Sequence, residues 1–301
     1  MNAMTIPASP RELLRIYAHT LDRLGFVPRT PGWSPGAGRR PGIATGFSVD
    51  FADYRKYNYG DDVRYIDWSI YARLRKLFLR QFRAESELTV HLLLDVSRSM
   101  DFGGTTKLEF AVRLAAAFSY VGLNKQDRVG LATFSDDVRR LLPPQRGRRQ
   151  LHHILALLDE SSPEGVSDFD RSFRSYAARA SSRGLLILFS DCYSPNGYRD
   201  ALRSLSFAGF EVAVVRVLAA EECRPEFEEG AELRDLEHPE TRGPTINGDV
   251  VAGYRRNLDS YSQELAAFCL NEGFLLVEST TSLTFEELTI RLLRAGIWCN
   301  T

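Results

Sequence analysis

Beyond residue 87 the chain alternates between short apolar runs and longer segments in which apolar residues recur every three to four positions. The apolar runs predict strands, and the longer segments predict helices. Near-continuous apolar strands that alternate with helices are typical of a parallel sheet covered on both faces. We therefore predict an α/β fold with a doubly wound, mostly parallel, Rossmann-like sheet. The predicted strands cover residues 88–94, 128–134, 139–142, 185–190, 211–218 and 274–278. The predicted helices cover residues 106–123, 148–158, 170–180, 198–205 and 251–270. A capping box at Thr284 predicts the start of a last helix.

The N-terminal part of the chain has a different pattern. The sequence Ser9-Pro10-Arg11-Glu12 predicts a helix start with a hydroxyl cap, and this helix should reach about residue 24 and stop at Gly25. Prolines and glycines crowd residues 28–46, which predicts a loop or linker. A polar and aromatic stretch then leads into a strand predicted at residues 77–82.

Two stretches of opposite charge lie outside the predicted sheet. Residues 1–86 hold fourteen lysines and arginines against eight acidic residues, a charge of +6, and residues 219–240 hold nine acidic residues against two arginines, a charge of −7. They are either two solvated faces or, in a sharper hypothesis, parts of one small β-rich subdomain. The predicted division is residues 1–86 for the N-terminal helix, linker and subdomain segment, 87–218 for the core, 219–250 for an acidic insertion joining the subdomain, and 251–299 for the C-terminal part of the core.

Composition narrows the class of protein. The 301 residues are 44% hydrophobic and 26% charged, as in globular proteins that bury a core, and the net charge is −1. A charge near zero gives no field that favours nucleic acid or an anionic membrane, so neither is an expected partner. No apolar run is long enough to span a bilayer, and no secretion signal is evident. The four widely spaced cysteines predict reduced thiols, and we expect a cytoplasmic protein.

Oxygen-bearing side chains follow the predicted strands at three turns. Asp95-Val96-Ser97-Arg98-Ser99 ends the strand at 88–94, and Ser190-Asp191 ends the strand at 185–190. Gly165-Val166-Ser167-Asp168 precedes a helix. Ligands of open α/β sheets bind beyond the carboxyl ends of the strands, and hydroxyl and carboxylate oxygens suit Mg²⁺ or Mn²⁺. The alternative is that the first turn merely caps a helix. For Asp168, capping the next helix is favoured over ligation.

The order of these three turns resembles the metal-ion-dependent adhesion site (MIDAS) of von Willebrand factor A domains, over roughly residues 88–278. The resemblance implies that Ser97 and Ser99 bind one Mg²⁺ or Mn²⁺ directly and that Ser167 takes the place of the family's threonine. It implies that Asp95 and Asp191 act mainly through water. Serine keeps the hydroxyl of threonine but loses the methyl group that fixes its rotamer.

A narrower resemblance covers about residues 40–218. The sequence Tyr59-Gly60-Asp61-Asp62-Val63-Arg64-Tyr65-Ile66-Asp67-Trp68, followed by Ala72-Arg73 and Leu79-Arg80, is similar to the signature of domain-of-unknown-function family 58 (DUF 58). The segment Leu142-Pro143-Pro144 fits the same family. The resemblance implies a von Willebrand factor A-like protein that accompanies MoxR-type AAA+ ATPases. The family's biochemical activity is not established.

Two readings are open for the acidic residues of this signature. Asp61, Asp62 and Asp67 with Arg64 and Arg73 form either an active site or, as we favour, a salt-bridged turn that anchors the N-terminal segment to the sheet. His91, inside the first core strand, is more readily a core histidine than a ligand.

The leading functional hypothesis is a metal-dependent protein-interaction module that binds an exposed Asp or Glu of a protein partner. The family resemblance implies that it works with a MoxR-type AAA+ ATPase in assembling or remodelling a client complex. One alternative is an enzyme, either a Mg²⁺-dependent phosphohydrolase or a serine hydrolase using Ser97. However, Ser97 stands where a haloacid-dehalogenase-like phosphatase needs a second aspartate, and no G-x-S-x-G elbow occurs. The other alternative is a scaffold with a vestigial metal site. We therefore expect no catalytic residues and no enzymatic activity.

Overall fold

The computed structural model describes residues 9–27, 49–57, 63, 66–84, 88–225, 232–234, 242–245 and 247–300. At its centre is a six-stranded sheet with the order β11-β8-β7-β4-β5-β6. All neighbouring strands are parallel except the edge pair β5 and β6, which is antiparallel. The predicted α/β fold with a mostly parallel sheet is thus confirmed. The strands are β4 (Thr89–Asp95), β5 (Arg128–Phe134), β6 (Val138–Gln145), β7 (Leu185–Ser190), β8 (Glu211–Leu218) and β11 (Leu275–Thr280).

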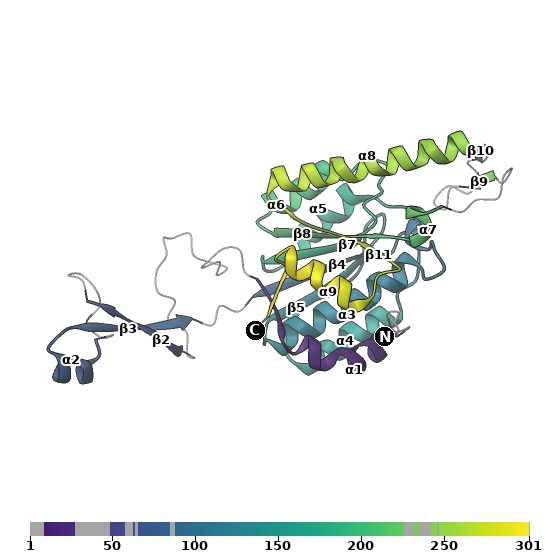
Figure 1. The fold of residues 1–301 in the computed structure, drawn as a ribbon. Coiled ribbons are helices and arrows are strands. Elements are labelled where there is room, and N and C mark those ends of the chain that lie inside the picture. The colour runs from purple at the N-terminus through teal and green to yellow at the C-terminus, as the bar shows by residue number, and fades with distance from the viewer. Residues whose placement is uncertain are drawn as a thin grey trace. The chain divides into compact units, whose positions relative to one another are not determined.

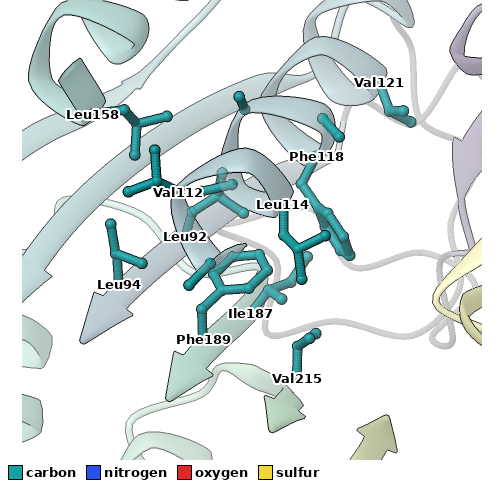
Figure 2. Close-up of a cluster of buried hydrophobic side chains, with 14 of the residues drawn as sticks. Leu92, Leu94, Val112, Leu114, Phe118, Val121, Leu158, Ile187, Phe189 and Val215 are labelled. Atoms are coloured by element: carbon teal, nitrogen blue, oxygen red, sulfur yellow. The ribbon is translucent and has the colours of Figure 1, made fainter. Parts of the chain in front are cut away.

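Helices cover both faces of the sheet (Figure 1). On one face lie α1 (Pro10–Leu21), α3 (Lys107–Asn124), α4 (Arg148–Asp159) and α9 (Phe285–Arg294), and on the other lie α5 (Phe169–Arg179), α6 (Arg199–Phe207) and α8 (Gly248–Glu272). Because side chains alternate along a strand, Leu92 and Leu94 enter one core while Leu93 enters the other. Figure 2 shows part of the first core, in which β4, β7 and α3 meet.

A segment near the N-terminus and a segment near the C-terminus are joined by a pair of very short strands. β1 (Leu24–Phe26) pairs antiparallel with β12 (Trp298–Asn300). Helix α1 packs on α3 through its buried apolar stripe, which includes Leu13 and Leu21. Ser9 makes no side-chain cap bond to α1, so the predicted hydroxyl cap is wrong, although Pro10 does open the helix.

The structure divides into two compact units, residues 1–29 with 88–301, and residues 30–87. The division differs from the predicted boundaries because α1 and β1 belong with the core. The insertion after β8 also groups with the core and contains α7 (Ala220–Cys223) and the antiparallel pair β9 (Glu232–Arg234) and β10 (Arg242–Thr245). That the insertion joins the N-terminal segment in one subdomain stays a prediction.

The described residues of the smaller unit include an antiparallel ribbon and a short helix. The ribbon consists of β2 (Val49–Lys56) and β3 (Phe78–Ala84), and α2 (Trp68–Leu74) lies between them in the sequence. Asp67 accepts hydrogen bonds from the backbone nitrogens of Ser69 and Ile70, which caps α2. Asp61, Asp62 and Arg64 lie outside the described residues. Within the described ranges, no helix has the length and apolar character needed to cross a membrane.

Candidate functional site

The predicted site residues gather where the direction of winding of the sheet changes. From β4 the chain passes through α3 on one face to β5, and from β7 it passes through α6 on the opposite face to β8. The two connections leave adjacent strands in opposite directions, and in open α/β sheets ligands bind at such a point, in the crevice beyond the carboxyl ends of the strands. Asp95 is the last residue of β4, and Asp191 follows the last residue of β7.

Ser190 ties the two strand ends together. Its hydroxyl donates a hydrogen bond to Oδ2 of Asp95 at 2.6 Å and accepts one from the backbone nitrogen of Cys192 at 2.9 Å. The other oxygen of Asp95 accepts a bond from the backbone nitrogen of Ser97 at 2.9 Å. Asp95 is completely buried, and these bonds fix its carboxylate in one orientation.

The hydroxyl groups of Ser97 and Ser99 form a hydrogen bond, with their oxygens 3.1 Å apart. Neighbouring ligands of an octahedral Mg²⁺ with bonds of about 2.1 Å are separated by about 3.0 Å, so this spacing fits two adjacent positions of one coordination shell. Ser97 is fully buried and Ser99 is half-buried, which places Ser99 on the solvent side of the pair. Arg98, between them, is exposed.

The turn that carries Ser167 lies against the turn that carries Ser97. The backbone nitrogen of Arg98 donates to the carbonyl oxygen of Gly165 at 3.1 Å, and the nitrogen of Glu164 donates to Val96. Ser167 is 2% exposed. Asp168 accepts a bond from the backbone nitrogen of Arg171 and caps α5, which confirms its predicted role.

Gly165 allows this close approach. Its φ of +72° lies in the region that side chains disfavour, and a Cβ atom there would come within 2.9 Å of the hydroxyl oxygen of Ser135. The glycine is therefore required for the turn to reach the crevice.

Asp191 has a partner that the sequence did not suggest. Its Oδ2 accepts a hydrogen bond from Nζ of Lys107 at 2.6 Å, and its Oδ1 accepts one from the backbone nitrogen of Tyr193 at 2.9 Å. Nζ of Lys107 also lies 2.7 Å from Oε1 of Glu222 on α7. Lys107 is 1% exposed, and Asp191 is fully buried.

Arg216 holds the backbone on the far side of Asp191. This fully buried residue of β8 donates from Nε to the carbonyl oxygen of Asp191 at 3.2 Å. Its guanidinium group lies over the rings of Tyr193 and Tyr261, and it forms an ion pair with Glu278 at 3.0 Å. Cys192, which follows Asp191, adopts a φ of +63°, and its carbonyl oxygen accepts a bond from Tyr261. The turn after β7 is thus held in a conformation that a non-glycine residue rarely adopts.

The electrostatics of the crevice favour a cation. Burial, and then the charge of Asp191, raise the pKa of Asp95 to about 7. Burial lowers the pKa of Lys107, but Asp191 and Glu222 more than offset this effect, so the pKa is raised and Lys107 stays charged. Nζ of Lys107 contacts two carboxylates, those of Asp191 and Glu222, and with Asp95 these four groups carry a charge of −2 when all are ionised.

The donor set fits a hard divalent ion bound by hydroxyls. Among the described residues, no group of three or more histidine, cysteine, aspartate or glutamate side chains is arranged to hold a metal. An ion at this site would therefore depend on the serine oxygens, with the two aspartates as charge partners. Neutral oxygen ligands suit Mg²⁺ or Mn²⁺ far better than Zn²⁺.

Comparison with known proteins gives relatives without an assigned activity. Uncharacterized proteins of Mycobacterium bovis and Mycobacterium tuberculosis are 29% identical over 240 residues, which is 78% of this chain. The chain covers 66% of the length of these relatives, just under two thirds.

Among solved structures, the conserved hypothetical protein BatB from Bacteroides thetaiotaomicron is 19% identical over 69% of this chain and 98% of its own, with a TM-score of 0.43. An aerotolerance-related membrane protein from Bacteroides fragilis is 23% identical over 43% of this chain and 67% of its own, with a TM-score of 0.36. TM-scores this low say nothing about function. The family model described as "Protein of unknown function DUF58" matches residues 53–257, more than half of the sequence. The chain therefore belongs to the DUF58 family.

Proposed function

We propose that the chain is a metal-ion-dependent protein-interaction module with a von Willebrand factor A-like core. In this proposal one Mg²⁺ or Mn²⁺ is held at the crevice, and an acidic side chain of a protein partner completes its coordination. The observation that carries the proposal is the 3.1 Å spacing of two serine hydroxyls beside two fully buried aspartates. The residues concerned are Asp95, Ser97, Ser99, Ser167 and Asp191.

The proposed division of labour follows from the geometry of each side chain. Ser97 and Ser99 offer neutral oxygens, so direct ligation by them leaves a bound ion with most of its positive charge. Asp95 and Asp191 already accept hydrogen bonds at both oxygens, which suits a role through water. A divalent ion supplies exchangeable water positions that a carboxylate can replace.

The solvent side of the site is suited to an acidic ligand. Ser99 is half-buried, and the exposed Arg98 adds a positive charge beside it. A partner's glutamate or aspartate would thus meet both the ion and an arginine. Hydrolysis would further need a general base and a placed nucleophile. Asp95, the buried carboxylate nearest to the serines, is instead engaged by Ser190 and by the backbone of Ser97.

Calorimetric titration with Mn²⁺ tests the metal site. We expect the wild-type protein to bind one ion and Ser99→Ala to bind at least about tenfold more weakly, because one direct oxygen is lost. Ser204→Ala, which changes a half-buried serine of α6, is the matched control and should bind like the wild type. Equal heats from the wild type and Ser99→Ala would remove the metal site from the proposal.

Pull-down experiments test the docking role. The family resemblance suggests a MoxR-type AAA+ ATPase as the first partner to try. We expect retention of that partner in Mg²⁺ and its loss in a chelator or in Ser99→Ala, with Ser204→Ala unaffected. Retention that neither the chelator nor Ser99→Ala changes would refute metal-dependent docking.

A further inference from the structure

Lys107 lies in a place that disfavours a positive charge. It is the first residue of α3, where the helix dipole repels cations, and its side chain is 1% exposed. Burying an ammonium group is costly unless charges of opposite sign surround it. Asp191 at 2.6 Å and Glu222 at 2.7 Å meet that requirement, and the ring of Tyr193 lies 5.5 Å from Nζ. The two carboxylates therefore hold Lys107 at a helix position that is unfavourable for a positive charge.

Glu222 is held so that it can keep contact with Lys107. One of its carboxylate oxygens accepts a bond from the backbone nitrogen of Ala219 at 2.8 Å, which leaves the other for Lys107. The helix α7 that carries it is itself fixed, because the nitrogen of Ala220 donates to Thr281. Its neighbour Glu221 points to a different partner and accepts a bond from the backbone nitrogen of Gly104 at 2.9 Å.

We infer that Lys107 is the resident cation of this site. Its ammonium group neutralises Asp191 when no divalent ion is bound, and Glu222 neutralises the ammonium group when an ion is bound. This inference rests on the proposed metal-binding function and concerns its regulation. Lys107 repels an incoming divalent ion and also releases Asp191 to it, whereas Glu222 compensates the lysine charge. The two residues therefore set the affinity of the site with opposite signs.

The same arrangement explains how the fold tolerates an empty site. Without Lys107, the buried carboxylate of Asp191 would lose its ion-pair partner, and its desolvation would destabilise the native state. With Lys107, the crevice is stable in the absence of metal, and the ion is free to exchange.

Mn²⁺ titration of charge variants tests the inference. Lys107→Met should bind Mn²⁺ at least about tenfold more tightly, because it removes the positive charge that is paired with Asp191. Glu222→Gln should bind Mn²⁺ about tenfold more weakly, because it removes the negative charge that compensates Lys107. Glu221→Gln is the matched control, since it removes the same charge from the adjacent residue of α7. Its affinity should stay within about twofold of the wild type.

Thermal unfolding with and without Mn²⁺ gives a second measurement. Lys107→Met should melt at a lower temperature than the wild type without metal and recover more on adding Mn²⁺. If Lys107→Met does not fold, Glu222→Gln and its control still decide the question.

The outcomes separate this inference from the proposed function. Mn²⁺ binding by the wild type with unchanged affinity in Lys107→Met and Glu222→Gln overturns the role of Lys107 alone. Absence of binding in every variant overturns both. If Lys107→Met binds Mn²⁺ and the wild type does not, the result supports Lys107 as the resident cation and refutes metal-dependent docking by the natural protein.

Discussion

Replacing His91 with phenylalanine should remove an acid-sensitive contribution to the stability of the protein. His91 lies inside β4 and is fully buried, with its Nδ1 2.7 Å from the hydroxyl oxygen of Tyr176. Its other ring nitrogen has no hydrogen-bond partner among the described residues. Burial, followed by the charge of Arg183, lowers the pKa of His91 to about 4. The native protein thus keeps this ring neutral at pH values where the unfolded chain protonates it.

The size of the effect follows from proton linkage. The unfolded chain takes up this proton near pH 6.5 and the native protein only near pH 4, so stability is present above pH 6.5 and is lost as the pH falls. The gap between the two pKa values corresponds to about 3 kcal/mol. Between pH 7 and pH 5 the expected loss is about 2 kcal/mol, because the histidine of the unfolded chain is mostly protonated at pH 5.

Urea denaturation at pH 7 and pH 5 measures this contribution. The quantity to compare is the difference in unfolding free energy between His91→Phe and the wild type, since other groups titrate alike in both. The lost bond to Tyr176 lowers the stability of the variant equally at both pH values and cancels. Exposed His153, changed to phenylalanine, is the control. If the difference between His91→Phe and the wild type is the same at both pH values, the reasoning is refuted.

Three further substitutions test the fold and the site. Burial raises the pKa of Asp127 to about 6, so the wild type should lose up to about 3 kcal/mol as the pH rises from 4 to above 6, and Asp127→Asn should lack this loss in urea denaturation. Ser190→Ala should cost about 1–3 kcal/mol, because two buried hydrogen bonds lose their shared partner, and unchanged stability would contradict its bridging role. Gly184→Ala should cost about 3 kcal/mol or more, because its Cβ would meet a backbone oxygen of β4 at 2.1 Å, whereas Gly248→Ala, with open space around it, should melt like the wild type.

Three strands of the sheet could be predicted from the sequence to the residue, and β4 to within one residue at each end. The observed bounds of β5, β7 and β8 equal the predicted ones. A strand buried on both faces is marked by a continuous apolar run, and each of these runs ends at a polar or glycine-containing turn. Local sequence is sufficient where burial itself creates the pattern.

The edge strands and short strands were harder to predict. The predicted strand at 139–142 extends in the structure over Val138–Gln145 and includes Pro143 and Pro144. Proline is tolerated there because β6 is an edge strand, which has one side without ladder partners. β1 and β12 have three residues each and depend on pairing between the two ends of the chain, which no local pattern reveals. α1 ends at Leu21, before the predicted residue 24, and Leu24 belongs to β1 instead.

The candidate site was predictable only in part. Three polar turns after strands or before a helix indicated which residues would meet, and the structure brings the turns at Ser97 and Gly165 into hydrogen-bond contact. Lys107 and Glu222 gave no comparable signal, because they come from a helix start and an insertion far apart in the sequence. The one available hint was a lysine directly after the Thr106 cap, where acidic residues are usual.

The register of the sheet decides whether the site exists at all. β4 and β7 pair so that Leu94 lies beside Phe189, which places the next residues, Asp95 and Ser190, side by side although they are 95 positions apart. A slip of one residue would turn every side chain of β7 to the opposite core and would separate the serine from the aspartate. The two apolar cores prevent that slip, since Leu188 and Phe189 enter different ones. The packing that stabilises the sheet is therefore also what holds the buried hydroxyl of Ser190 against the carboxylate of Asp95.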